Sequence, residues 1–356
     1  MVFDIDEILY PAWKEASKGK HNQQNQAKYE CYLTENLYAL QQSLINDTYK
    51  PAPLRVKRIT IPKKRIAQVP SLEDKIVQHA ICDNYAYERL TKPLVKETCA
   101  CIKGRGTDYA RNLVKQQLSA FYREYGVKPY ILKVDIKSYF ASIPHWRIIK
   151  LIDRYIEDED VKRIMLKFVH LTRIGLPLGL QQSQLLANLY LSGLDHYLKE
   201  QCGCKYYGRY MDDFYVMSDS KEFLEDIWKK IEDYVISIGL DLNPKTRIQY
   251  NRIEHLGFVF KLTDTGKVIV TLNNQKKLTQ RHRVRLLVKQ LVNGEKTTED
   301  VCNSYNGWRH HALKGNTRSV VLAMDEALSE ALKPYGYRVY VGEKGLIKIC
   351  QDQYRK

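Results

Sequence analysis

The chain has 356 residues, of which 44% are hydrophobic and 28% charged, so it can bury a real core and form two or three packed subdomains. Its 57 Lys and Arg residues against 41 Asp and Glu residues give a net charge of +16, which favours a polyanionic partner such as nucleic acid. The eight cysteines lack the spacing of a zinc site, the N-terminus carries acids where a signal peptide needs bases, and no apolar run is long enough for a membrane span. We therefore expect a cytoplasmic protein with reduced thiols and no membrane partner.

Residues 1–50 have apolar side chains at helical spacing and predict helices, with an exposed loop over the polar stretch KGKHNQQNQ. The next segment, PAPLRVKRITIPKKRIAQVP at 51–70, holds six basic side chains and no acid. Its alternation of basic and apolar residues predicts a β-hairpin with one charged face. Such a hairpin suits phosphate binding, or equally a solvated edge strand that is protected by its charge.

Two helices are predicted in the region that follows. Ser71 is a suitable N-cap, and Asp74 stands where a capping box places its acidic residue, so a helix is expected over SLEDKIVQHAICDNYAYERLTKPLV at 71–95. After a Gly-Arg-Gly turn, a basic amphipathic helix is expected to begin near Thr107. The turn is too short to be assigned as a phosphate loop, so it is interpreted as a connection.

Acidic residues stand at the ends of predicted strands in two places. The run YILKV at 130–134 predicts a strand with Asp135 at its end, and GRYMDDFYVMS at 208–218 predicts two short strands with Asp212 and Asp213 at the turn between them. A solvated turn would tolerate adjacent acids. Carboxylates that converge from a strand end and a hairpin tip would instead suit a pair of divalent ions for phosphoryl transfer.

From about residue 53 to about residue 320 the chain resembles the reverse transcriptases, specifically the prokaryotic enzymes related to those of group II introns. Seven segments carry this resemblance in the family's order: RITIPKKRIAQVPSLEDKIVQHAI, CIKGRGTDYA, KVDIKSYFASI, GLPLGLQQSQLLANLYLSGLD, RYMDDFYV, LDLNPKT and EHLGFVF. The resemblance implies an α+β fold, the right-hand polymerase with fingers, a palm of antiparallel sheet plus helices, and a helical thumb. The expected boundaries are 1–50 for an N-terminal helical extension, 51–129 for fingers with part of the palm, 130–262 for a palm with the catalytic aspartates and primer grip, 263–335 for a thumb of basic helices, and 336–356 for a C-terminal tail.

The resemblance also implies the roles of individual residues. Asp135, Asp212 and Asp213 would be catalytic and would bind two Mg²⁺ ions, for which Mn²⁺ is a substitute, together with the backbone carbonyl of Ile136. Lys245 would protonate the pyrophosphate leaving group. The residues expected to bind the nucleotide are Lys63, Lys64, Arg65, Phe140, Leu178 and Gly179, and those expected to form the primer grip are Leu256, Gly257 and Phe258. Phe140 matches the aromatic steric gate that excludes a 2′-hydroxyl, and core packing is its alternative role.

Residues 271–293 hold six Lys and Arg residues and no acid, with Leu and Val at helical spacing. They predict a basic helix, either solvated or laid along the backbone of a template-primer duplex. The residues expected to contact nucleic acid here and in the segment 304–320 are Arg281, Arg283, Arg285, Lys289, Trp308, Arg309, His310 and Lys314. The tail PYGYRVYVGEKGLIKICQ predicts a small pair of strands.

The segment Leu178-Gly179-Leu180-Gln181-Gln182-Ser183-Gln184 stands where many family members have Gln-Gly-x-x-x-Ser-Pro. Its aliphatic first residue and its final Gln resemble reverse transcriptases of diversity-generating retroelements, in which the aliphatic residue is associated with error-prone copying of template adenines. Leu180 and Gln182 differ from the Asn and Thr that are usual in that group.

The favoured function is therefore an RNA-directed DNA polymerase that makes complementary DNA from a cognate RNA by two-metal nucleotidyl transfer, as in those retroelements. One alternative is a reverse transcriptase of an antiphage defence or retron-like system that copies a noncoding RNA. An RNA-templated RNA polymerase and a catalytically idle RNA-binding scaffold are the others. The expected partners are template RNA, the RNA/DNA duplex, deoxynucleoside triphosphates, and a structured noncoding RNA or small helical accessory protein, with oligomerisation left open.

Overall fold

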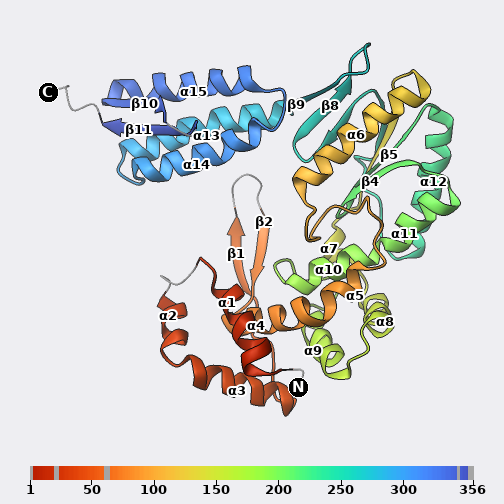
Figure 1. The fold of residues 1–356 in the computed structure, drawn as a ribbon, viewed down its shortest axis with the longest axis vertical. Coiled ribbons are helices and arrows are strands. Elements are labelled where there is room, and N and C mark those ends of the chain that lie inside the picture. Colours follow the sequence, from red (N-terminus) through yellow and green to blue (C-terminus); the bar gives the residue numbers. More distant parts are fainter. Residues whose placement is uncertain (1–2, 20–23, 60–64, 343–344, 352–356) are drawn as a thin grey trace. The chain divides into compact units, whose positions relative to one another are not determined.

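A computed structural model describes residues 3–19, 24–59, 65–342 and 345–351 (Figure 1). The chain divides into two compact units, the first made of Met1–Leu113 and Ile131–Ile248 and the second of Val114–Tyr130 and Gln249–Lys356. The division falls within helix α6 (Thr107–Tyr125), which begins at the predicted residue. Both units combine helices with antiparallel strands, which confirms the predicted α+β class.

The first unit opens with helices η1 (Ile5–Leu9), α1 (Tyr10–Ser17), α2 (Gln24–Cys31) and α3 (Leu33–Ile45), as the helical spacing of this region predicts. The prediction of a loop throughout KGKHNQQNQ is wrong at its end, because α2 begins at Gln24. Gln26 is buried there, and its side-chain amide donates to Ser17 Oγ at 2.5 Å and to Glu30 Oε1 at 3.0 Å. A polar residue is buried at this position because its amide group finds partners.

The basic segment forms the predicted hairpin of β1 (Arg55–Ile59) and β2 (Arg65–Val69), which pair in an antiparallel register. Helix α4 (Leu72–Ile81) follows, and Ser71 and Asp74 form the complete capping box that the sequence predicts. The buried carboxylate of Asp74 also accepts a hydrogen bond of 2.6 Å from the Tyr49 hydroxyl. Asp74 thereby ties the start of α4 to the end of the helical N-terminal segment. Helices η2 (Cys82–Ala86) and α5 (Tyr87–Thr91) continue from α4.

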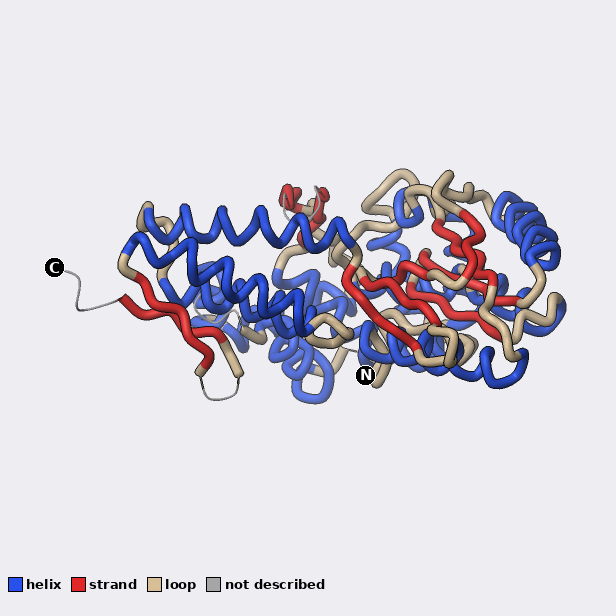
Figure 2. Tube along the Cα trace, turned by 90° about the horizontal axis from the view of Figure 1, so that it is seen from above, coloured by secondary structure: helices blue, strands red, loops and turns tan. Residues whose placement is uncertain are grey.

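A four-stranded sheet with the order β4-β5-β3-β6 lies in the middle of the chain and is shown in red in Figure 2. Its strands are β3 (Tyr130–Asp135), β4 (Tyr206–Tyr210), β5 (Asp213–Ser218) and β6 (Arg247–Tyr250), so the predicted strand and hairpin are confirmed. The helices between these strands are α7 (Tyr139–Ser142), α8 (His145–Tyr155), α9 (Glu159–Val169), α10 (Gln181–Tyr190), α11 (Ser192–His196), η3 (Tyr197–Gln201) and α12 (Lys221–Ser237). Strand β4 is the first strand in this order, and its first four residues are buried. The segment 97–99 covers this edge of the sheet, because the Arg209 N–H donates to the Glu97 carbonyl at 3.1 Å and the Cys99 N–H donates to the Arg209 carbonyl at 2.9 Å.

The second unit contains a three-stranded antiparallel sheet of β7 (Ile253–His255), β8 (Phe258–Leu262) and β9 (Val268–Leu272). Helices α13 (Asn274–Val292), α14 (Thr298–Ala312) and α15 (Arg318–Leu332) follow, then the turn η4 (Lys333–Tyr335) and the hairpin of β10 (Tyr337–Val341) and β11 (Ile347–Gln351). The hairpin lies against the three helices in both views (Figures 1 and 2), and Ile347 and Ile349 enter their common core. The predicted basic helix and the predicted strand pair are thus confirmed. Within the described residues, no helix has the length and apolarity needed to cross a membrane.

The contacts of Asp74 generate a prediction about stability. Replacing Asp74 by Ala removes an anionic acceptor that serves Tyr49 and the N-terminus of α4, so we expect the free energy of unfolding to fall by about 2–3 kcal/mol. Urea denaturation followed by fluorescence measures this loss. Glu73→Ala, which removes an exposed carboxylate in the same turn of α4, is the control. Equal losses in the two variants would contradict the role assigned to Asp74.

Candidate active site

Asp212 lies in the two-residue turn that joins β4 to β5. Tyr210 and Asp213 are directly paired across the hairpin, so Met211 and Asp212 form the turn itself. Met211 has a φ of 62°, in the left-handed region that a residue with a Cβ adopts rarely. The sequence has no glycine here, although glycine is the usual residue at such a turn position. The turn therefore needs support from its surroundings.

Asp135 ends strand β3, which lies next to β5 in the sheet. Burial raises the pKa of Asp212 above its ordinary value, and the nearby carboxylate of Asp135 raises it further. The second effect is repulsion between two like charges, which disfavours ionisation of both groups together. The structure thus brings the strand-end aspartate and the hairpin aspartate together, as the sequence analysis expects.

Asp213 has a charged partner of its own. Its carboxylate forms an ion pair with Lys133 of the neighbouring strand β3. Lys133 and Asp135 are two residues apart on this strand, so their side chains point to the same face of the sheet. In the part of the chain that the structure describes, no group of three or more His, Cys, Asp or Glu side chains is arranged to hold a metal ion. The carboxylates that meet at the site are therefore those of Asp135 and Asp212.

The residues at this point fit a divalent cation on electrostatic grounds. A cation would remove the repulsion between Asp135 and Asp212, and carboxylate oxygens are the ligands that Mg²⁺ prefers. Two hydrogen bonds flank Ile136. The Asn243 N–H donates to the Asp135 carbonyl at 2.8 Å, and the Lys137 N–H donates to the Asp241 carbonyl at 2.9 Å. Ile136 is consequently a non-hydrogen-bonded member of this pairing, and its carbonyl points away from that segment. The pairing with 241–243 therefore does not use this carbonyl, which is a candidate further oxygen ligand.

Lys245 belongs to a loop that is bonded to the end of β3. The Asn243 N–H donates to the Asp135 carbonyl at 2.8 Å, and the Asn243 side-chain oxygen accepts from the Lys245 N–H at 3.1 Å. Lys245 itself is exposed. The backbone of the Asn-Pro-Lys segment is thus anchored beside the first aspartate, while the Lys245 side chain extends into solvent.

Leu178 and Gly179 pair with strand β2 of the basic hairpin. The Leu178 N–H donates to the side-chain oxygen of Gln68 at 3.0 Å, and its carbonyl accepts from the Gln68 N–H at 3.2 Å. Gly179 has a φ of 114°, and a methyl group there would overlap the Gln68 carbonyl, so glycine is required. Arg65 begins β2, whereas Lys63 and Lys64 lie outside the described residues.

Phe140 lies in the short helix α7, five residues after Asp135 in the sequence, and its side chain is half-buried. Its ring meets that of Tyr139 edge to face, with centroids 5.7 Å apart. Its carbonyl accepts a hydrogen bond of 2.7 Å from the Leu176 N–H, and Gly175 lies so close that a Cβ would overlap this backbone. The position of Phe140 is therefore held by backbone contacts with the segment 175–176, which leads to Leu178.

Gln182 has a partner that sequence reasoning missed. Its N–H donates to Gln78 Oε1 at 3.0 Å, and the Gln78 side-chain amide donates to Gln182 Oε1 at 3.2 Å. Both side chains are buried, so each amide supplies the hydrogen bonds that the other needs. Gln182 is thus matched by Gln78 of helix α4. Gln182 stands in the polar run Gln181-Gln182-Ser183-Gln184 at the start of α10, so no signal in the sequence distinguished it.

The residues expected to grip the primer form a tight turn in the second unit. His255 and Phe258 pair directly across the β7–β8 hairpin, which leaves Leu256 and Gly257 as the turn. Their φ values of 50° and 84° are both left-handed, as a turn that matches the twist of a hairpin requires. Phe258 is buried, whereas Leu256 and Gly257 are partly accessible to solvent.

Helix α13 presents a basic stripe. Arg281, Arg285 and Lys289 are exposed and four residues apart, so they lie along one face of the helix, while Val284 and Val288 are buried. Arg283 instead donates to Ser304 Oγ at 2.7 Å.

The other residues expected to contact nucleic acid lie in and just after α14. Arg309 pairs with Asp325 at 3.0 Å, and its guanidinium also donates to the Gly345 carbonyl. Trp308 packs against the core of the second unit. His310 is exposed, and Lys314 is half-buried. Arg309 and Trp308 thus have structural partners inside this unit.

Sequence reasoning also assigned no role to Arg209 and Asp195, which form a fully buried ion pair. Arg209 stands two residues before Met211 of the turn, and Asp195 lies in helix α11. The signal for Arg209 was an arginine in the middle of an otherwise apolar strand. The signal for Asp195 was an acid in an apolar helical run.

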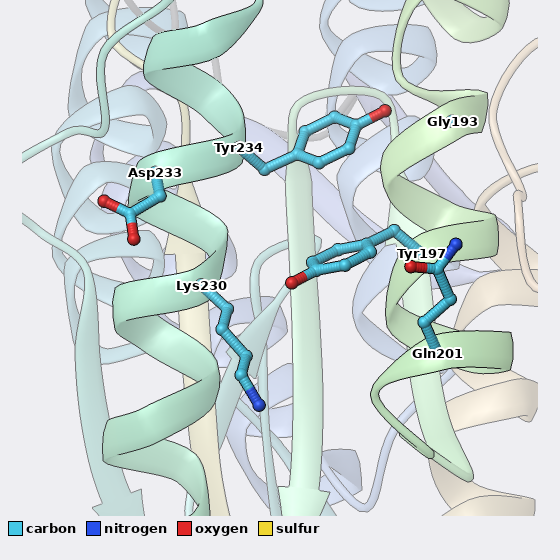
Figure 3. Close-up of a pocket in the computed structure, with 6 residues that line it drawn as sticks. All are labelled: Gly193, Tyr197, Gln201, Lys230, Asp233 and Tyr234. Carbon is cyan, nitrogen blue, oxygen red and sulfur yellow. The ribbon is translucent and has the colours of Figure 1, made fainter.

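A cavity of about 490 Å³ opens between α11, η3 and α12 (Figure 3). The rings of Tyr197 and Tyr234 stack inside it with centroids 5.4 Å apart, and the Tyr234 hydroxyl points toward Gly193. A Cβ at position 193 would lie 2.5 Å from that hydroxyl. None of the predicted site residues lines this cavity.

Comparison with known proteins places the sequence in a family. The model of the family "Reverse transcriptase (RNA-dependent DNA polymerase)" matches residues 57–260, more than half of the chain. The group II intron-encoded protein LtrA of Lactococcus lactis subsp. cremoris is 29% identical over an alignment of 182 residues, and the match covers 47% of this chain and 29% of LtrA. The protein YkfC of Escherichia coli (strain K12) is 28% identical over 205 residues, 52% of each chain. The chain thus matches about half or less of the length of these relatives.

Comparison with solved structures finds similarity to telomerases. Telomerase from Candida albicans in complex with a TWJ fragment of telomeric RNA has a TM-score of 0.47 and 11% identity, covering 81% of this chain and 58% of that one. Apo telomerase from Candida tropicalis has a TM-score of 0.48 and 12% identity, covering 83% and 62%.

The raised pKa of Asp212 leads to a prediction about metal binding. A carboxyl group whose pKa is raised on folding destabilises the folded state once pH exceeds its ordinary pKa of about 3.9, because the folded protein holds that proton more tightly than the unfolded chain does. Without divalent ions at pH 7.5, we therefore expect Asp212→Asn to raise Tm by about 2 °C. The gain should vanish below about pH 3, where both states are protonated.

Added Mg²⁺ should raise the Tm of the unsubstituted chain and leave that of Asp212→Asn nearly unchanged, as measured by differential scanning fluorimetry. Asp219→Asn, at an exposed position just after β5, is the matched control and should respond to Mg²⁺ as the unsubstituted chain does. The same response in Asp212→Asn would show that Asp212 holds no cation.

Proposed function

Because this chain belongs to the reverse transcriptase family, we propose that it is an RNA-directed DNA polymerase that copies a cognate RNA into complementary DNA. The observation that carries this proposal is the meeting of Asp135 and Asp212, one from a strand end and one from a hairpin turn, inside the region that matches the family. Their separation in the sequence and their proximity in the fold suit a site that binds cations and transfers a nucleotidyl group.

Asp135, Asp212 and the Ile136 carbonyl would hold the divalent ions, with Mg²⁺ as the expected metal. Bound there, such ions supply electrostatic stabilisation of the charge that develops on the transferring phosphoryl group. Asp213 would support the site through its ion pair with Lys133. Lys245 would donate a proton to the departing pyrophosphate, for which its loop is anchored at the Asp135 carbonyl.

Lys63, Lys64 and Arg65 would bind the triphosphate of the incoming nucleotide, since cationic side chains stabilise a transferring phosphoryl group. Leu178 and Gly179 would border the base pair that is being formed, because their backbone pairs with Gln68 of the same hairpin. The half-buried ring of Phe140 would exclude a 2′-hydroxyl. This favours deoxynucleotides and argues against an RNA-templated RNA polymerase. Retention of Asp135, Asp212 and Asp213 argues against an idle scaffold.

In the second unit, Leu256, Gly257 and Phe258 would hold the primer, and the stripe of Arg281, Arg285 and Lys289 would bind the phosphates of the template-primer duplex. These three side chains are exposed and four residues apart along α13, which suits contacts with the phosphates of a nucleic-acid backbone and not with the bases. Arg283, Trp308, Arg309, His310 and Lys314 were expected to join them, and His310 is the most exposed of this set. The net charge of +16 agrees with such a polyanionic partner.

For the biological setting we propose a retroelement that diversifies sequence, on the basis of Leu178 and Gln184. Leu178 is 46% exposed, and its side chain offers no hydrogen bond to a nucleotide, so a mispair would lose less relative to a correct pair than it would beside an amide. A defence or retron-like enzyme that copies a noncoding RNA is the alternative. A cytoplasmic location and a structured RNA or small helical protein as partner belong to both settings.

Primer extension tests the proposed activity. With an RNA template, a DNA primer and Mg²⁺, we expect the chain to incorporate deoxynucleotides and to discriminate against ribonucleotides. Asp135→Asn should lower kcat by about 10³-fold or more, because it removes a charge from the cation site. Asp219→Asn is again the control. Extension by Asp135→Asn at the unsubstituted rate would contradict the proposal, and preferential use of ribonucleotides would favour the RNA polymerase.

Sequencing of the complementary DNA tests the setting. We expect mismatches concentrated at template adenines, and we expect Leu178→Gln to reduce their frequency by about tenfold, because an amide can bond a correctly placed nucleotide. Ile174→Gln, which changes another exposed aliphatic residue of the same loop, should leave the frequency unchanged. Faithful copying by the unsubstituted chain would favour the defence or retron-like alternative.

A further inference from the structure

Arg209 of strand β4 is fully buried, and its guanidinium is held by Asp195 of helix α11. Arg209 Nε donates to Asp195 Oδ1 at 2.7 Å, and Nη2 donates to Oδ2 at 2.5 Å. The same carboxylate accepts from the hydroxyl groups of Tyr207 and Thr98, at 2.5 and 3.1 Å. Burial alone would lower the pKa of Arg209, but Asp195 reverses this effect and raises it, so the guanidinium stays charged.

The remaining donors of Arg209 reach the active-site turn and helix α10. Nη1 donates to the Met211 carbonyl at 3.0 Å and to Asn188 Oδ1 at 3.3 Å, while Nη2 also donates to the Asn188 carbonyl at 3.0 Å. Asn188 in turn donates to the Ala100 carbonyl at 2.7 Å. One side chain thus connects the turn to α10, α11 and the segment 98–100.

The Met211 carbonyl belongs to the peptide bond that leads directly into Asp212. Met211 holds a left-handed φ of 62°, which costs about 1 kcal/mol or more for a residue with a side chain. Such a conformation persists only where the surroundings impose it. Resting on the proposed function, we propose that Arg209 is a positioning residue: it fixes the orientation of the Met211-Asp212 peptide and thereby aims the Asp212 carboxylate at the cation site beside Asp135.

Packing alone does not account for this arrangement. Removing two charges from water costs several kcal/mol per ion, and apolar residues of similar volume often replace a buried ion pair without loss of stability. A planar guanidinium, however, has five donors in a fixed fork and can bond a carboxylate on one edge and the turn carbonyl on another. The contact with Met211 supplies a role that an apolar residue in β4 could not fill.

Arg209→Lys tests the proposal, since an ammonium group can keep the charge beside Asp195 but cannot span the distance to both Asp195 and the Met211 carbonyl. Tyr207→Phe is the matched control: it removes a buried hydrogen bond to the same carboxylate and leaves the contact with Met211 intact. A double variant, Arg209→Gln/Asp195→Asn, replaces the ion pair by neutral amides and avoids an unpaired buried charge. The readouts are the Mg²⁺-dependent rise in Tm, the Mg²⁺ concentration for half-maximal primer extension, kcat, and KM for deoxynucleotide.

We expect Arg209→Lys and the double variant to lose most of the Mg²⁺-dependent rise in Tm, and to need about tenfold more Mg²⁺ for half-maximal extension. Their kcat should fall about 10²-fold while KM for deoxynucleotide changes less than about threefold. The reason is that the substitutions disturb the orientation of the Asp212 carboxylate and leave the nucleotide-binding residues unchanged. Tyr207→Phe should retain the Mg²⁺ response and kcat at a comparable loss of Tm.

The positioning role is overturned if Arg209→Lys and the double variant keep the Mg²⁺ response, or if Tyr207→Phe loses it to the same extent. The absence of any Mg²⁺-dependent rise in the unsubstituted chain would also overturn it. An unsubstituted chain that responds to Mg²⁺ but extends no primer would contradict the proposed function instead, and the Tm measurements would still decide the role of Arg209.

Discussion

The buried ion pair between Arg209 and Asp195 is the interaction on which the rest of the active site depends. It joins strand β4, helices α10 and α11 and the segment 98–100 at one point, and it supplies the hydrogen bond to the Met211 carbonyl. Each charge is taken out of water, so neither is tolerated without the other. The result is a polar contact inside an apolar core that can assemble only when all these segments are in place.

Asp135 and Asp212 repel each other, in contrast to the attraction between Arg209 and Asp195. Asp135 and Asp212 are brought together by the pairing of neighbouring strands, although each disfavours the charge of the other. Folding energy therefore holds two carboxylates where a cation would stabilise them. Asp213 forms an ion pair with Lys133, so this carboxylate has a charge of opposite sign beside it.

Two pairs of amide contacts join the basic hairpin and helix α4 to the segment 178–184. Gln68 of β2 bonds the backbone of Leu178, and Gln78 of α4 bonds Gln182. Three residues of this segment have local explanations. Gly179 is required by its backbone, and Gln182 is matched by its buried partner. Leu178 has an exposed side chain that is not needed for packing. That freedom is what makes Leu178 a candidate for a role in substrate selection.

The sequence by itself determined the local elements and the placement of acids on them. Periodicity, the capping box at Ser71 and the turn residues predicted the β-hairpins, the strand before Asp135 and the basic helix, because these signals act over a few residues. Only the tertiary structure decided which buried polar groups become partners. Gln78 and Gln182 are 104 residues apart, and Thr98 and Asp195 are 97 apart. Their hydrogen bonds depend on the packing of distant segments, and no local pattern encodes that packing.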